Sequence, residues 1–107
     1  MIISEEFDTA FKSWFEACKT MVENDRRNEQ FPDLNKTIFI AGGRKYAKIV
    51  TCYVTGDAES VWAFVDTTNG DVLKPASWKA PAKHARGNIF DKDNGLGSIG
   101  PYGPNYL

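Results

Sequence analysis

The sequence has few of the residues that build metal centres, disulfide frameworks or membrane spans. Its 107 residues include only two cysteines and one histidine, too few for a typical zinc site. No run approaches the ~18 apolar residues that a transmembrane helix needs. The start MIISEEF has no basic region of the kind that opens a secretory signal. We therefore expect a protein of a reducing, cytoplasmic compartment that does not bind membranes.

The composition predicts one domain over residues 1–107. Hydrophobic residues make up 42% of the chain, which is typical of folded proteins. Aromatic residues reach 13% and can supply much of a core. Cys18 and Cys52 lie within apolar patterns, so we expect two small buried side chains, with a single disulfide as the alternative.

The formal net charge of −1 conceals a division of charge along the chain. Residues 1–35 carry eight acids and four bases, whereas residues 36–107 carry nine bases and six acids. The first third is therefore acidic and the remainder basic, an asymmetry that is informative about partners.

The first third of the chain has the pattern of an amphipathic helix over about residues 4–27. Ser4 is suited to cap its start, and Phe31-Pro32 closes the segment because residues before proline avoid helix. Arg26 and Arg27 suit its C-terminal end. Apolar residues recur at spacings of three and four, which predicts one buried stripe: Phe7, Ala10, Phe11, Trp14, Phe15, Cys18, Met21 and Val22.

Residues 37–74 have the pattern of an antiparallel sheet. Gly42-Gly43 and Asn69-Gly70 are turn signals, the second being the strongest hairpin signal in the chain. Short connections between consecutive strands favour a meander. We predict an α+β fold with the N-terminal helix packed on four antiparallel strands: about 37–41, 46–54, 61–66 and 71–74.

Residues 75–107 lack a regular pattern. We expect an extended basic segment holding at most a helical turn, followed by an irregular tail rich in glycine and proline. Several apolar residues could fix that tail across the domain: Leu96, Ile99, Tyr102, Tyr106 and Leu107.

The basic segment is the best candidate for a binding site, because it contains no acid from Lys74 to Arg86. Prolines and alanines favour an extended chain from which side chains project. Cations bind phosphate, and an indole stacks on a base. We therefore predict a surface for phosphate-bearing ligands formed by Lys74, Trp78, Lys79, Lys83, His84 and Arg86.

Simpler interpretations of this segment stay open. Its lysines can be ordinary solvated side chains, and Trp78 can cap the core with lysine stems lying on it. Arg44, Lys45 and Lys48 would extend the surface if the second strand lies nearby. Gly42-Gly43-Arg44-Lys45 lacks the spacing of a phosphate-binding loop, so we interpret it as a hairpin turn.

No motif predicts catalysis, a metal or a cofactor. His84 has no serine or cysteine tied to it by a recognisable pattern. A Mg²⁺ site would need several acids at one place, for which the candidates are Asp66, Asp71, Asp91 and Asp93. Asp66 and Asp71 also suit hairpin turns.

The later part of the chain resembles small uncharacterised proteins of tailed bacteriophages. The resemblance covers GGRKYAKIV at 42–50 and VWAFVDTTNGDVLKPASWKAPAKHARGNIFD at 61–91, of which PASWKAPAKHARGNIFD is the specific portion. It implies a phage protein acting in the cytoplasm of an infected bacterium, and it carries no catalytic residues. By analogy, such proteins often bind nucleic acids, host enzymes or defence signals.

We expect a non-enzymatic protein that binds nucleic acid or a signalling nucleotide, with counter-defence as one role that this would suit. The alternative is a protein–protein inhibitor of a host or defence enzyme, with Trp62 or Tyr102 as exposed anchors. A third hypothesis is a small metal-dependent nuclease or hydrolase. A sheet edge could support a homodimer, so the oligomeric state stays open.

Overall fold

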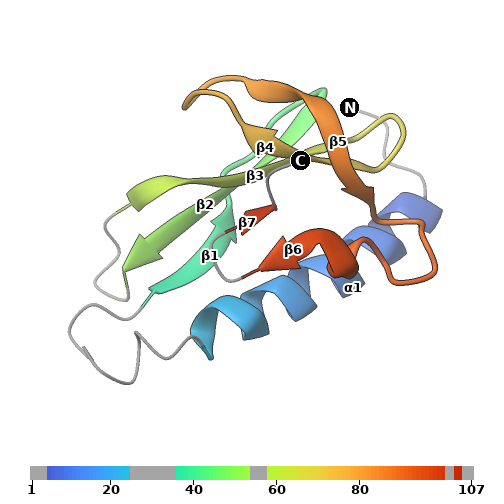
Figure 1. Ribbon diagram of the computed structural model, residues 1–107, viewed down its shortest axis with the longest axis horizontal. Coiled ribbons are helices and arrows are strands. Elements are labelled where there is room, and N and C mark those ends of the chain that lie inside the picture. The colour runs from blue at the N-terminus through green and yellow to red at the C-terminus, as the bar shows by residue number, and fades with distance from the viewer. Residues whose placement is uncertain (1–4, 25–35, 54–57, 101–102, 105–107) are drawn as a thin grey trace.

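The computed structural model describes residues 5–24, 36–53, 58–100 and 103–104. One helix lies along one face of a five-stranded antiparallel sheet, and the C-terminal segment lies beside the helix (Figure 1). The predicted α+β class and meander are confirmed, with one strand more than the four expected.

Helix α1 runs from Glu5 to Glu23 and buries five of the eight residues of the predicted stripe, the other three being partly buried. Acidic residues occupy its first turn, where they favour the positive end of the helix dipole. The side chains that it buries follow spacings of three and four residues: Phe7, Phe11, Trp14, Cys18 and Val22. The capping role of Ser4 and the predicted helix end at Arg26, Arg27 and Phe31-Pro32 lie outside the described residues.

The sheet has the strand order β1-β2-β3-β4-β5, and every neighbouring pair is antiparallel. Each strand therefore follows its neighbour through a hairpin or a short connection, as predicted for the first four. The strands are β1 Lys36–Ile40, β2 Tyr46–Tyr53, β3 Ala58–Asp66, β4 Asp71–Pro75 and β5 Pro81–Asn88.

Strand β5 corrects the expectation that the basic segment would hold no long element. It pairs with β4 from Asp71↔Asn88 to Pro75↔Pro81, with two irregularities in register. Proline, alanine and glycine have low strand propensity, so the local sequence does not predict this strand. An edge position tolerates them because only one side of the strand has to pair.

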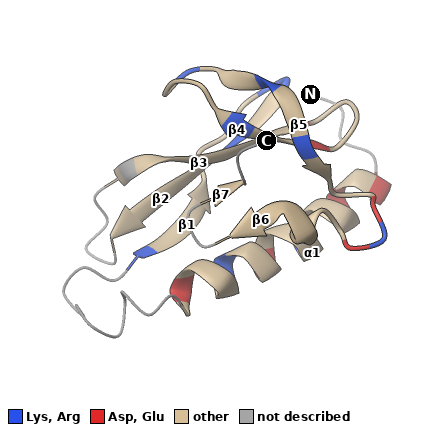
Figure 2. Ribbon diagram, viewed as in Figure 1, with Lys and Arg blue, Asp and Glu red and all other residues tan. Residues whose placement is uncertain are grey.

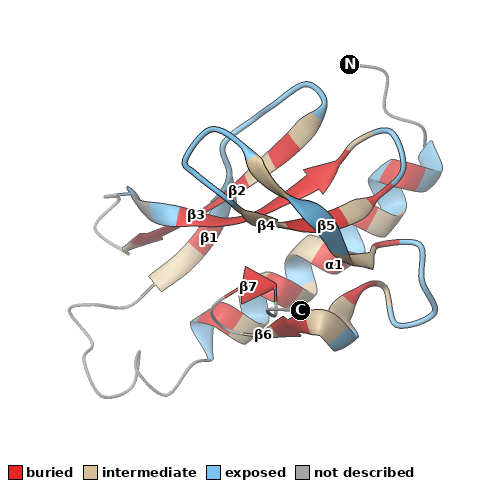
Figure 3. Cartoon of the chain, turned by 45° about the horizontal axis from the view of Figure 1, so that its top comes forward, coloured by how far each residue is buried: buried red, intermediate tan, exposed pale blue. Residues whose placement is uncertain are grey.

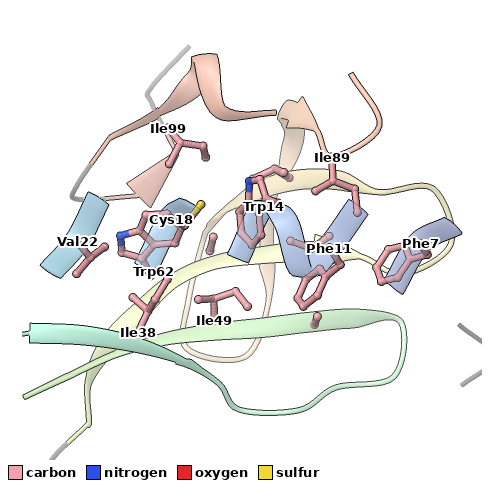
Figure 4. Close-up of a cluster of buried hydrophobic side chains, with 14 residues drawn as sticks. Phe7, Phe11, Trp14, Cys18, Val22, Ile38, Ile49, Trp62, Ile89 and Ile99 are labelled. Atoms are coloured by element: carbon pink, nitrogen blue, oxygen red, sulfur yellow. The ribbon is translucent and has the colours of Figure 1, made fainter. Parts of the chain in front are cut away.

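A bulge in β3 turns two successive residues toward the helix. Ile49 pairs with Ala63 while Val50 pairs with Val61, so Trp62 is the extra residue on β3. Trp62 and Ala63 both join the core beneath α1 (Figure 4). Trp62 is only 3% exposed, and the prediction that it is an exposed anchor is therefore wrong.

The C-terminal segment closes the helix side of the sheet. It comprises the 3-10 helix η2, Leu96–Ser98, and two short strands, β6 Ile99–Gly100 and β7 Gly103–Pro104. Ile99 enters the core and Leu96 packs against it. The described part of the tail is thus fixed to the domain, while Tyr102, Tyr106 and Leu107 lie outside the described residues.

The opposite face of the sheet, which we call the outer face, carries a second and smaller apolar cluster. Val61, Phe64 and Leu73 are buried there, with Tyr46 packed against them. Figure 3 shows this buried centre of the sheet giving way to exposed connections at the ends of its hairpins. None of the helices in the described part of the chain is long and apolar enough to cross a bilayer.

Candidate anion-binding site

A cleft of about 330 Å³ lies between two hairpins at one end of the outer face. The loop 41–45, which joins β1 to β2, lines the cleft, and Lys79 from the β4–β5 connection lines it as well. Tyr46, Lys48 and Phe64 complete the lining from β2 and β3. In a meander the β1–β2 loop and the β4–β5 connection begin at opposite ends of the sheet, so Lys79 reaches the cleft because the β4–β5 hairpin extends back over the outer face.

Four of the nine described residues that line the cleft are cations, and none of the nine is an acid. The cations are Arg44, Lys45, Lys48 and Lys79. Figure 2 shows acidic segments at both ends of α1 and in the loop after β5, and basic segments along the β4–β5 hairpin. The acidic first third of the sequence thus supplies the helix layer, and basic residues of the later part gather around the cleft.

Aromatic rings adjoin the cations of the cleft. The Lys48 ammonium lies 5.0 Å from the centroid of the Trp78 ring, and that of Lys45 lies 5.3 Å from the Tyr46 ring. Both distances are typical of cation–π contacts. Trp78 is 49% exposed, so its indole does not seal the core and retains surface that a planar ligand can contact.

The β1–β2 loop is anchored at both ends. Lys48 closes the hairpin by donating its amide to the Gly42 carbonyl (2.9 Å) and accepting from the Ala41 amide (2.8 Å). Thr67, in the β3–β4 turn, donates its hydroxyl toward the carbonyls of Arg44 (2.8 Å) and Lys45 (2.9 Å). The Thr67 amide also donates to the Lys45 carbonyl (2.8 Å). The main chain that carries two of the four cations is therefore held from the neighbouring hairpin.

The six residues predicted as a binding surface occupy three different places. Lys79 lines the cleft, and Trp78 adjoins it through Lys48. Lys74 lies on the helix side of the sheet, where its ammonium donates to the Pro104 carbonyl (2.9 Å). Its neighbour Leu73 belongs to the outer-face cluster, and alternation along the strand turns Lys74 the other way.

The remaining three predicted residues lie on edge strand β5. Lys83 and His84 are exposed, and Arg86 is partly buried with its guanidinium donating to the His84 carbonyl. The described lining of the cleft includes none of these three residues. The basic segment is therefore not a single surface, because its two halves belong to a loop and to a strand.

Most of the cations of the cleft come from residues that were expected only to extend the binding surface. Arg44, Lys45 and Lys48 supply three of its four cations. Alternation along β2 places Tyr46 and Lys48 on the same face of the strand. No signal in the sequence marked Thr67 as a support for the loop, because its partners lie more than 20 residues away.

The acidic residues considered for Mg²⁺ are largely engaged in turns. Asp66 accepts from the amide and hydroxyl of Thr68, and Asp71 accepts from Asn88. Asp93 accepts from the amides of Gly95 and Gly97. Within the described ranges, no three His, Cys, Asp or Glu side chains are grouped to hold a metal ion.

Comparison with known proteins places the chain in a family. The model of a family of unknown function, DUF7717, matches residues 4–98. The chain belongs to DUF7717. The matched range of DUF7717 includes α1, all five strands of the large sheet and every residue that lines the cleft. No curated protein and no solved structure matches the chain.

Proposed function

We propose that this protein is a non-enzymatic binding protein that takes a phosphate-bearing ligand in the cleft between its two hairpins. The observation that carries the proposal is the convergence of Arg44, Lys45, Lys48 and Lys79 on one cleft whose described lining holds no acid. Charge-assisted hydrogen bonds from such cations are the strong contacts by which proteins hold phosphate. The half-exposed Trp78 beside Lys48 adds a surface on which a base can stack.

A pair of matched charge variants tests this proposal. The double change Lys48→Gln/Lys79→Gln removes two cations from the cleft, whereas Lys12→Gln/Lys92→Gln removes two exposed cations from α1 and from the loop after β5. Titration calorimetry would use adenosine triphosphate and a ten-nucleotide oligothymidylate as probes. Both double variants change the net charge equally, so their difference reports the position of the charge.

We expect the cleft variant to lose at least ten-fold in affinity and the control to change by less than two-fold. Binding of the oligothymidylate should also weaken as salt is added. Equal losses in the two variants, or no binding of either probe at millimolar concentration, would refute the proposal.

A protein interface is the second candidate function, favoured by exposed apolar side chains on β1. Phe39 is 39% and Ile40 46% exposed on this edge strand, and an edge strand with exposed apolar side chains is a place where another chain can dock. Under this candidate, the protein captures an identified partner protein, and this capture withstands nuclease treatment and high salt. The double variant Phe39→Ser/Ile40→Ser should abolish the capture. The same variant should bind nucleotide normally.

A further inference from the structure

The cleft is small and its charge is concentrated, which narrows the class of ligand. We propose that the ligand is a free nucleotide with two or more consecutive phosphates, bound with its phosphates among the four cations and its base against Trp78. This inference rests on the proposed function and chooses between its two ligand classes.

The placement of the cations favours several phosphates at one point. A single strand carries one negative charge per nucleotide, so a protein that binds it spreads its cations along a groove. Here the cations come from three separate segments that line one cleft: Arg44 and Lys45 from the β1–β2 loop, Lys48 from β2, and Lys79 from the β4–β5 connection. A chain of phosphates in a free nucleotide matches that concentration of charge.

The volume of the cleft agrees with a ligand of one nucleotide. At about 330 Å³ it lies near the lower end of the range for small-molecule pockets, roughly 300–1,000 Å³. Lys83 and His84 on β5 are outside the lining, so the cations of the cleft do not continue along that strand as a lining for a polymer.

The anchored loop suits a compact anion as well. Thr67 holds the carbonyls of Arg44 and Lys45 through its hydroxyl and its amide. The main chain behind the two cations is thus fixed before a ligand arrives, which lowers the entropy lost on binding.

Lys48 connects the anionic and aromatic parts of the proposed site. It lines the cleft, and its ammonium is 5.0 Å from the Trp78 ring. A ligand with phosphates at Lys48 therefore places its base within reach of an indole that is 49% exposed. The two ends of the site recognise different parts of one molecule, and they can be tested separately.

Titration calorimetry without divalent metal, at fixed ionic strength, would compare four probes. The first probe is whichever of adenosine triphosphate and guanosine triphosphate binds more tightly, and the second is the corresponding monophosphate. The third is inorganic tripolyphosphate and the fourth is a ten-nucleotide oligothymidylate. We expect the triphosphate to bind at least ten-fold more tightly than the monophosphate and at least five-fold more tightly than tripolyphosphate. Trp78→Ala should remove the advantage over tripolyphosphate and leave the affinity for tripolyphosphate itself unchanged.

The proposed function and this inference fail in different ways. If the oligothymidylate binds more tightly than the triphosphate, and more tightly still as it lengthens, the ligand is a strand and the inference is wrong. Equal binding of mono- and triphosphate, or an unchanged preference in Trp78→Ala, also overturns it. The proposed function itself fails only when no phosphate probe binds or when the cleft variant behaves as its control does.

Discussion

At the scale of single residues, Gly43 is the position where the cleft depends most on one choice of amino acid. Its φ of +127° is one that residues with a side chain rarely adopt, and a Cβ there would lie 1.8 Å from the Tyr46 carbonyl oxygen. Gly42 next to it has φ +97°, but a Cβ on that residue would project into open space. Alanine at Gly42 would therefore cause backbone strain alone, whereas alanine at Gly43 would add a collision with Tyr46.

We expect Gly42→Ala to lower the free energy of unfolding by about 1 kcal/mol, the lower end of the cost of a sparsely populated backbone conformation. Gly43→Ala should cost more and weaken nucleotide binding as well, because the loop must move to relieve the collision with Tyr46. Urea denaturation and calorimetry of both variants check this. Identical behaviour of the two would show that the collision does not shape the loop.

A second prediction at this scale concerns the effect of pH on stability through Cys18. Both cysteines are free and buried, as expected from their apolar surroundings. Burial raises the pKa of the Cys18 thiol from 9.0 to about 12, since desolvation disfavours the thiolate. A thiol whose pKa is raised by folding stabilises the fold fully below pH 9 and loses that contribution as the pH rises toward 12.

The free energy of unfolding should therefore fall between about pH 9 and 11 with a contribution from Cys18 of at most about 1.4 kcal/mol per pH unit. Cys18→Ala should be less stable at neutral pH because of its cavity, yet show a shallower alkaline decline. Urea denaturation of both proteins from about pH 7 to 11 measures the difference in slope. Parallel curves would contradict the assignment of a raised pKa to Cys18.

At the scale of elements, the β3–β4 turn supports the β1–β2 loop through Thr67. The Thr67 amide donates to the Lys45 carbonyl, and the single hydroxyl hydrogen of Thr67 is shared between the carbonyls of Arg44 and Lys45. Thr67 does not line the cleft, so we regard it as a positioning residue for the two cations.

Replacement of the hydroxyl tests this role. Thr67→Val keeps the shape and the amide bond, and it should cost about 1 kcal/mol of stability and three- to ten-fold in nucleotide affinity. Thr67→Ser restores the hydroxyl and should recover the affinity. If Thr67 only stabilises the fold, Thr67→Val should lower the free energy of unfolding without changing nucleotide affinity. Urea denaturation measures the first quantity and titration calorimetry the second.

At the scale of the whole molecule, the sheet separates the cations of the basic segment onto its two faces. Lys79 lies at the cleft, whereas Lys74 donates to the Pro104 carbonyl on the side of α1. Charges on opposite sides of the sheet are also screened from each other at physiological salt, where the Debye length is about 8 Å. One lysine should thus serve binding and the other stability.

Lys74→Met should lower the free energy of unfolding by about 1.5–3 kcal/mol, the contribution of a hydrogen bond that involves a charged group, and change nucleotide affinity by less than two-fold. Lys79→Met should do the reverse, with little loss of stability and at least five-fold weaker binding. Urea denaturation and calorimetry of the pair distinguish the two roles. Equal loss of affinity would mean that the face of the sheet does not matter.

Much of the architecture could be predicted because it follows from local periodicity. Residues close together in the chain determine the stripe of α1, the first four strands and the turns at Gly42-Gly43 and Asn69-Gly70. Short connections then favour only a meander. By itself, the sequence determined the α+β class, the order of these elements and the apolar side of the helix.

The tertiary structure alone decided β5, the inward turn of Trp62 and the membership of the cleft. Strand β5 exists through its pairing with β4, despite residues of low strand propensity. Trp62 faces the core because a bulge adds one residue to β3. The loop 41–45 meets Lys79 across more than 30 residues of chain, and contacts of that separation depend on strand register and sheet order, which local patterns do not contain.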